Sequence, residues 1–215
     1  MQITWLGQAC FKIQTNNTTI IIDPFDPKIG LKMPRVTADI VLSTHDHYDH
    51  NNISAIKGTD VDPFIINNPG EYEVKDVFIY GIKSFHDKSE GKERGDNTIY
   101  RIEAENINLA HLGDLGHALS NGQLEQLQGV DILMIPVGGT YTINAKEANE
   151  VISQIEPRIV IPMHYKIKGL NINLDPIDKF CKETGVCATD TLPKLKIVKK
   201  DLPQEEMKII ILQPA

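Results

Sequence analysis

One stretch of this chain carries most of its information: Val41-Leu42-Ser43-Thr44-His45-Asp46-His47-Tyr48-Asp49-His50. It runs from an apolar segment into a cluster of imidazole and carboxylate groups, the ligands that borderline divalent metals prefer. His45 and His47 are two positions apart, so in extended backbone their side chains leave on the same side. Asp49 and His50 need a turn in the backbone to bring their side chains around a second metal position. The spacing therefore favours two adjacent metal ions, because the backbone strains before one ion can take all four side chains.

Three more side chains that can bind metal lie just beyond the ends of apolar runs, and they are His86, Asp114 and His164. Side chains at the ends of several strands can converge on one edge of a sheet, where open α/β folds tend to hold their sites. The residues themselves therefore predict one site. Its expected ligands are His45, His47, Asp49, His50, His86, Asp114 and His164.

The pattern along the chain indicates an α/β protein with a strand-rich first half. β-branched and aromatic residues predict strands, as do later apolar runs, over residues 3–7, 10–14, 18–22, 39–43, 63–67, 77–85, 97–103, 107–112, 131–137, 158–163 and 208–212. Helices are expected after Ser120, over residues 144–155 with Asn144 as a cap, and over residues 175–184 before Gly185. Residues 188–206 have the composition of a polar surface excursion. With no linker or repeat, residues 1–215 are interpreted as one domain.

Composition narrows the class of protein. The 215 residues can bury a large core without disulfides. Three cysteines (Cys10, Cys181, Cys187) are too few and too scattered for a disulfide framework, so we expect reduced thiols and a cytoplasmic location. Neither a signal peptide nor a membrane span is expected. The net charge of −7 disfavours nucleic acid as a partner. A homo-oligomer is left open.

The motifs resemble those of the metallo-β-lactamase superfamily. His-x-His-x-Asp-His after a strand is similar to its signature, and His86, Gly113-Asp114 and His164 match its later motifs in order. The resemblance spans roughly residues 1–166. Within the superfamily, three segments are most similar to the small hydrolases related to the ascorbate-phosphate lactonases: Asn97-Thr98-Ile99-Tyr100, Gly113-Asp114-Leu115-Gly116-His117 and Pro162-Met163-His164-Tyr165.

The resemblance implies a fold and a set of roles. The expected fold is an αββα four-layer sandwich with the metal site at the edge between the two sheets. By the same resemblance, His45, His47 and His86 would hold the first metal, and Asp49, His50 and His164 the second. Asp114 would bridge the two metals, and Asp23 would support the metal loop. Zinc is the first expectation for the two divalent ions, with manganese or iron as alternatives.

This donor set predicts hydrolysis. Two divalent ions ~3.5–4 Å apart lower the pKa of a shared water, and the hydroxide that bridges them would attack a carbonyl or phosphorus centre. Asp49 is the candidate that orients the nucleophile and accepts its proton. His117 and Tyr141 are candidate proton donors to the product, and the Tyr141 phenol is an alternative hydrogen-bond donor to the oxyanion. Asp23, Asp46 and Asp87 are candidate partners of the ligand histidines.

Structural interpretations compete at several positions. His111 lies inside an apolar run, which favours a packed histidine. Asp46 and Asp87 are equally well explained as solvent-facing. Charges on loops are usually solvated, but four lie close to ligands and are the best-placed cations for an anionic substrate: Lys92, Arg94, Lys166 and Lys168.

The leading hypothesis is a metal-dependent hydrolase that acts on an ester, lactone or phosphoester of a small anionic molecule. A phosphodiesterase or RNA nuclease of the same superfamily is an alternative, since two-metal sites suit in-line displacement at phosphorus. The net charge and the lack of a long basic insertion weigh against it. An alternative of another class is a metal-stabilised binding or sensing protein without turnover.

Overall fold

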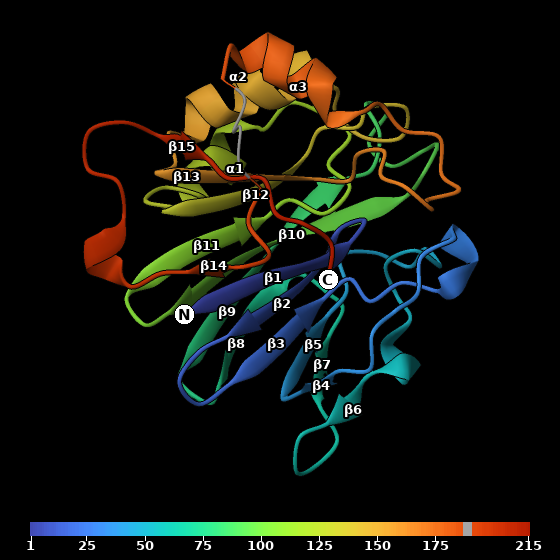
Figure 1. Ribbon diagram of the computed structural model, residues 1–215, viewed down its shortest axis with the longest axis vertical. Coiled ribbons are helices and arrows are strands. Elements are labelled where there is room, and N and C mark those ends of the chain that lie inside the picture. Colours follow the sequence, from blue (N-terminus) through green and yellow to red (C-terminus); the bar gives the residue numbers. More distant parts are fainter. Residues whose placement is uncertain (187–190) are drawn as a thin grey trace.

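Two β-sheets face each other in the computed structural model, which describes residues 1–186 and 191–215 (Figure 1). In spatial order, the first sheet contains β14 (Leu195–Lys196), β1 (Gln2–Gly7), β2 (Cys10–Gln14), β3 (Thr19–Ile22), β5 (Ile40–Leu42) and β7 (Phe64–Ile66). The second contains β15 (Lys208–Ile209), β13 (Ile159–Met163), β12 (Ile132–Pro136), β11 (Ile107–His111), β10 (Asp96–Ala104), β9 (Val77–Phe85) and β8 (Gly70–Val74). A short parallel pair consists of β4 (Thr37–Ala38) and β6 (Lys57–Gly58).

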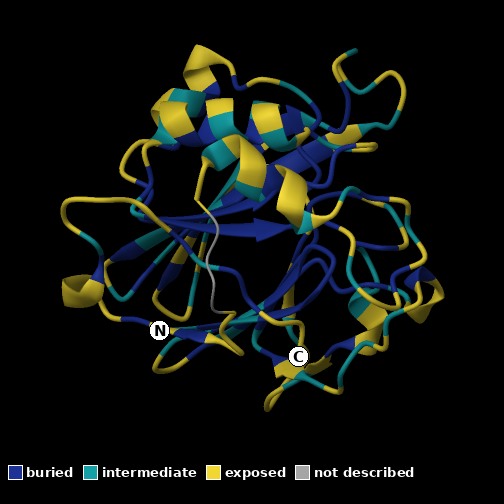
Figure 2. Cartoon of the chain, turned by 45° about the horizontal axis from the view of Figure 1, so that its top comes forward, coloured by how far each residue is buried: buried dark blue, intermediate teal, exposed yellow. Residues whose placement is uncertain are grey.

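Alternating side chains of the first sheet separate two apolar clusters. Ile20 and Ile22 of β3 belong to the main core between the sheets, whereas Ile21 points into a second cluster on the outer face. β5 repeats the pattern, since Leu42 faces inward and Val41 outward. A period of two is what a strand buried on both faces requires. Figure 2 shows the strands buried beneath helices whose outer surfaces are exposed.

The α-helices of the described residues all pack on the main core. They are α1 (Asn121–Gln126), α2 (Ala145–Ile155) and α3 (Ile177–Thr184). The caps are as expected: Ser120 and Asn144 each form a capping box, and Gly185 ends α3 in the left-handed conformation. Three 3₁₀ turns complete the described elements, namely Pro27–Ile29, Ile53–Ala55 and Lys199–Asp201.

The expected α/β sandwich is confirmed, with one difference in its outer layer. No residue of the outer cluster on the first sheet comes from a described α-helix; loops and 3₁₀ turns supply the covering side chains, such as Phe25 and Ile29. Pro27 begins the first 3₁₀ turn, at a position where the missing N–H is not needed, and Gly30, in the left-handed conformation, ends this turn after three residues.

Most predicted strands and all three predicted helices are present, and the differences lie at sheet edges. Residues 191–206 are mostly exposed, as expected for a polar surface excursion, but β14 within them pairs with β1, and Leu195 and Ile197 are buried. Residues 188–190 lie outside the described residues. The edge strand β8 was not predicted, since its sequence Gly-Glu-Tyr-Glu-Val is largely polar.

The cysteines differ in part from expectation. Cys10 is buried and free, as expected. Cys181 is disulfide-bonded, so the expectation of reduced thiols is wrong at that position. A count of cysteines does not show which thiols a fold brings together. Cys187 lies outside the described residues. Within the described chain, none of the helices has the length and apolarity needed to cross a membrane.

Candidate metal centre

The seven predicted ligands meet at one edge of the sandwich because their strands end there. β9 and β11 both pair antiparallel with β10, and β11, β12 and β13 run parallel, so β9, β11 and β13 end at the same edge. His86 follows β9 directly and His164 follows β13. Asp114 follows β11, and the loop after β5 brings the other four from the facing sheet: His45, His47, Asp49 and His50. Local apolar runs thus determine the strands, and their common direction determines the site.

These residues form two groups, each able to hold one ion. His45, His47 and His86 form the first group, and Asp49, His50, Asp114 and His164 form the second. Within each group, one ligand atom from every residue lies within 4.8 Å of the others. Histidine nitrogens and carboxylate oxygens suit zinc and other borderline divalent metals.

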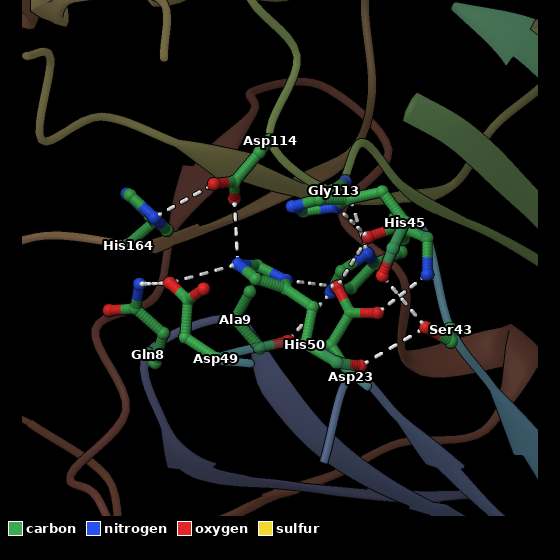
Figure 3. A network of polar contacts seen from close by, with 12 residues as sticks. Gln8, Ala9, Asp23, Ser43, His45, Asp49, His50, Gly113, Asp114 and His164 are labelled. Atoms are coloured by element: carbon green, nitrogen blue, oxygen red, sulfur yellow. Dashed lines mark hydrogen bonds and ion pairs between the residues drawn. The ribbon is translucent and has the colours of Figure 1, made fainter. Parts of the chain in front are cut away.

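Asp114 lies between the two groups (Figure 3). Its Oδ2 is 3.2 Å from Nε2 of His86 and 3.1 Å from Nε2 of His164. Its Oδ1 is 3.3 Å from Nε2 of His50. One carboxylate therefore faces ligand nitrogens of both groups, which is the position that a bridging ligand needs.

The polar atoms of the site fit a metal better than they fit each other. Nε2 of His45, Nε2 of His50 and Oδ1 of Asp114 are buried and lack a hydrogen-bond partner among the described residues. Although His50 Nε2 and Asp114 Oδ1 are an ion-pair distance apart, their geometry does not form a hydrogen bond. A buried polar atom without a partner is costly. One cation in each group would satisfy all three atoms, since His45 belongs to the first group and His50 and Asp114 belong to the second.

Asp23 fixes the loop that carries the first ligands. It ends β3 in the left-handed region at φ 50°, a conformation that aspartate tolerates. The backbone N–H of Thr44 donates to Oδ1 at 2.8 Å, and Thr44 Oγ1 donates to Oδ2 at 2.8 Å. Nδ1 of His50 lies 2.9 Å from Oδ2 (Figure 3). Of the three aspartates considered as partners of the ligand histidines, Asp23 is the one that bonds to a ligand ring.

These bonds also orient the ring nitrogens. The Thr44 hydroxyl donates its hydrogen to Asp23, so Thr44 Oγ1 accepts a hydrogen bond from Nδ1 of His45 at 2.9 Å. His50 likewise directs its Nδ1 hydrogen to Asp23. Nε2 of each imidazole therefore carries a lone pair that faces the centre. In metalloenzymes, groups that bond to the other ring nitrogen orient ligand histidines in the same way.

We expect Asp23→Asn to loosen the metal loop. The amide has the same shape and tolerates the same backbone conformation, but its NH₂ group cannot accept the hydrogen bonds that the carboxylate accepts. The free energy of unfolding should fall by about 3 kcal/mol, and metal affinity about 10- to 100-fold. Urea unfolding and chelator competition measure the two effects. The matched control is Asp46→Asn, because among the described residues the exposed Asp46 side chain bonds only to the Asn51 side chain. Equal effects in both variants would contradict the role of Asp23.

Asn97 and Gly113 position Asp114. The Asn97 amide donates to Ser84 Oγ at 2.7 Å and to the Leu112 carbonyl at 3.0 Å, while its Oδ1 accepts from the Asp114 N–H at 2.9 Å. Gly113 has φ +56°, and a Cβ there would lie 2.3 Å from Asn97 Oδ1. Glycine is therefore required at this position by both conformation and space.

Gln8 is a site residue that the sequence analysis missed. It is fully buried in the turn between β1 and β2, and its Nε2 donates to Oδ2 of Asp49 at 3.1 Å (Figure 3). The backbone carbonyl of Gln8 accepts a hydrogen bond from the backbone N–H of His164 at 3.1 Å. One residue thus contacts two predicted ligands. No local signal marks it, because glutamine is not a ligand and Asp49 is 41 positions away.

The electrostatics of the site favour a cation. Burial lowers the pKa of His50, but the carboxylates of Asp114, Asp23 and Asp49 outweigh it and raise this pKa well above its usual value. Burial raises the pKa of Asp49, but His50 outweighs it and lowers the pKa to about 2. Burial and then the charge of His50 lower the pKa of His45, which keeps its ring neutral and able to coordinate.

The other sequence candidates have structural explanations. His111 is buried with Nε2 2.8 Å from the Ala9 carbonyl and Nδ1 accepting from the Gly113 N–H, as expected for a packed histidine. His117 is not brought to the ligands' cavity: Nδ1 lies 2.7 Å from the Ala118 carbonyl, and Nε2 accepts from the Phe85 N–H. Both of its ring nitrogens are therefore occupied, and this geometry does not favour a proton donor. Asp87 bonds to backbone N–H groups of its own loop.

A cavity of about 710 Å³ opens over the ligands. Tyr141 lines it, as the prediction of a role in product formation requires, and so do Arg94 from the loop after β9 and Asn171 from the loop after β13. Of the four candidate cations, Arg94 is the one in this lining. Lys166 instead donates to the carbonyls of Leu170 and Ile172 and holds its loop together.

Known proteins agree with this architecture. The family model described as "Beta-lactamase superfamily domain" matches residues 2–164. A UPF0173 metal-dependent hydrolase of Thermococcus onnurineus is 32% identical over 190 residues, which covers 77% of this chain and 84% of that protein. A Thermotoga maritima structure, described as a candidate Zn-dependent hydrolase of the metallo-β-lactamase superfamily, is 39% identical with a TM-score of 0.78, covering 98% of this chain and 97% of that one.

A more distant structure supports the fold alone. An isothiocyanate hydrolase from Delia radicum gut bacteria is 16% identical, with a TM-score of 0.67 and coverage of 100% of this chain and 97% of that one. The family match covers most of the chain and includes both ligand groups. The chain belongs to the metallo-β-lactamase superfamily, and it is a metal-dependent hydrolase of that superfamily.

Proposed function

We propose that this hydrolase uses two divalent metal ions to cleave an ester, lactone or phosphoester bond in a small anionic molecule. The observation that carries the proposal is the convergence of two ligand groups, with Asp114 between them, beneath one cavity. His45, His47 and His86 would hold one ion, Asp49, His50 and His164 the other, and Asp114 would bridge them.

The size of the cavity supports a small substrate. Its volume of about 710 Å³ lies within the range of pockets that hold small molecules. The lining combines carboxylates and imidazoles at the ligands with Tyr48, Tyr141, Arg94 and Asn173 farther out. An acidic chain with one arginine in this lining is better suited to a compact anion than to a polynucleotide.

Bound metals would lower the pKa of a water and polarise the oxygen of the bond to be cleaved. The chain itself supplies orientation and proton transfer. Asp49 is held by the Gln8 amide at one oxygen, which directs the rest of the carboxylate toward the cavity. We assign Asp49 to orient the attacking water and accept its proton. Tyr141 lines the same cavity, and its hydroxyl makes no hydrogen bond to the described residues. It is the candidate donor to the product or to the oxyanion.

Zinc is the first metal to test, because the Thermotoga maritima protein is described as a candidate Zn-dependent hydrolase. The donor set contains nitrogen and oxygen but no thiolate, so manganese and iron are the alternatives. The lowered pKa values of His45 and His47 favour neutral imidazoles, which suit any of the three metals.

Metal removal tests the proposal directly. Protein purified without chelator or nickel should contain about two equivalents of metal per chain, as measured by elemental analysis. We expect it to hydrolyse members of a panel of phosphate esters, carboxylate esters and lactones. Dialysis against a chelator should remove metal and activity together, and zinc, manganese or iron should restore both. Metal-loaded protein that hydrolyses nothing in the panel would favour a binding or sensing role, and a chain that takes up no metal would refute the proposal.

A further inference from the structure

One cation in the lining of the cavity, Arg94, has no hydrogen-bond acceptor or carboxylate for its side chain among the described residues. Among the described residues that line the cavity, Arg94 is the only lysine or arginine. In the part of the chain that the structure describes, no carboxylate forms an ion pair with its guanidinium and no acceptor receives a hydrogen bond from it. An arginine that serves a structural role normally has such partners, since it carries five donors.

The acidic side chains nearby are already engaged. Glu93 accepts from Ser89 Oγ at 2.8 Å, and Glu147 pairs with Lys88. Asp87 accepts from four backbone N–H groups, and Asp46 from the Asn51 side chain. The charge of Arg94 is therefore left for a group that enters from solvent.

The loop that carries Arg94 is ordered independently of the arginine side chain. Oδ1 of Asp87 accepts from the N–H groups of Ser89 at 2.7 Å and Gly91 at 3.0 Å. Oδ2 accepts from Glu93 at 3.0 Å and Arg94 at 2.8 Å. Four bonds to one carboxylate form a rigid turn, so the guanidinium is presented with little loss of backbone entropy on binding.

Tyr141 holds the guanidinium over the cavity. The Arg94 Cζ atom lies 5.7 Å from the centroid of the Tyr141 ring, within the range of a cation–π contact. This contact uses none of the guanidinium N–H groups as hydrogen-bond donors to an acceptor in the described residues, and the N–H edge of a guanidinium matches a carboxylate or phosphate with two parallel hydrogen bonds. Asn171 and Asn173 add amide groups to the lining of the same cavity.

We propose that Arg94, in cation–π contact with Tyr141, is the subsite for a carboxylate or phosphate group that the substrate carries away from the bond to be cleaved. The inference rests on the proposed function and deepens it, because it assigns the anionic character of the substrate to one side chain. Arg94 is a specificity-determining residue in this scheme, whereas Asp87 positions it.

Binding of three matched probes tests the subsite. Isothermal titration of the metal-loaded chain with benzoate, phenylphosphonate and neutral benzamide measures affinity without turnover. Arg94→Gln should weaken binding of the anions about 10-fold or more, because hydrogen bonds to charged groups are among the strongest. It should leave benzamide binding unchanged. Arg94→Lys should restore part of the affinity, since lysine keeps the charge but loses the planar fork.

The matched control is Lys92→Gln, which removes one charge from the same loop at an exposed position outside the cavity lining. It should bind all three probes as the wild type does. Repeating the titrations after chelator treatment separates anion binding at Arg94 from anion binding at metal. An effect confined to phenylphosphonate identifies phosphate as the group, and an effect confined to benzoate identifies a carboxylate.

Two results would overturn the subsite: anion affinities unchanged in Arg94→Gln, or a wild type that does not prefer benzoate over benzamide. The hydrolysis panel keeps this failure separate from that of the proposed function. Turnover of neutral substrates without Arg94-dependent anion binding would leave the hydrolase and remove the subsite. Anion binding that depends on Arg94 without any turnover would leave the subsite and remove the proposed reaction.

Discussion

Replacing Asp114 with alanine is expected to lower kcat/KM by more than about 100-fold, the upper range for residues that act only through a metal ligand. Asp114 faces His86 in one group and His50 and His164 in the other. Removing it should therefore weaken binding of both ions. Elemental analysis of the variant should find clearly less metal per chain than in the wild type.

The charge of Asp114 accounts for this sensitivity. Burial raises the pKa of its carboxyl, but His164 and His50 outweigh burial and hold the pKa well below its usual value. The ionised carboxylate thus lies among histidines at 1% exposure. Asp114→Asn is the second variant, because it keeps the shape and removes the charge. It should also lose metal and activity while its circular dichroism spectrum matches that of the wild type. Full metal content in both variants would contradict the bridging assignment.

The second large effect is expected at a glycine far from the ligands in sequence. A Cβ on Gly138 would lie 2.0 Å from the His164 carbonyl oxygen and 3.0 Å from the Tyr165 Cα. Both are backbone atoms, so the chain at His164 must move. Gly138→Ala should lower the free energy of unfolding by about 1–3 kcal/mol or more, as overpacking does. It should also displace His164 and reduce the metal bound by the second group.

The matched control for Gly138 is Gly122→Ala in α1. A Cβ there meets nothing within 4 Å, and alanine is favoured over glycine in a helix by up to about 1 kcal/mol. That variant should be as stable as the wild type or slightly more stable, with full metal content. Urea unfolding compares the free energies of unfolding of the two variants, and elemental analysis compares their metal content. If Gly138→Ala retains wild-type stability and metal, the close approach of Gly138 to His164 does not position the ligand.

The sequence alone identified the candidate metal ligands of this protein. His45 to His50 lie within six positions, and the apolar runs before His86, Asp114 and His164 identify strands whose ends carry them. Such information is local: side-chain chemistry, strand period and spacing are all contained in short windows. The helix caps at Ser120 and Asn144 were predictable for the same reason.

The tertiary structure alone decided what surrounds those ligands. Gln8 reaches Asp49 across 41 positions, and Asp23 reaches His50 across 27. His117 bonds to the backbone, whereas Arg94 lines the cavity, although His117 is closer in sequence to a predicted ligand than Arg94 is. The direction of a side chain depends on the register of the sheets and on loop hydrogen bonds, such as the four that Asp87 accepts. Residue type and spacing specify what can bind metal, but contacts between distant segments specify which neighbours share its cavity.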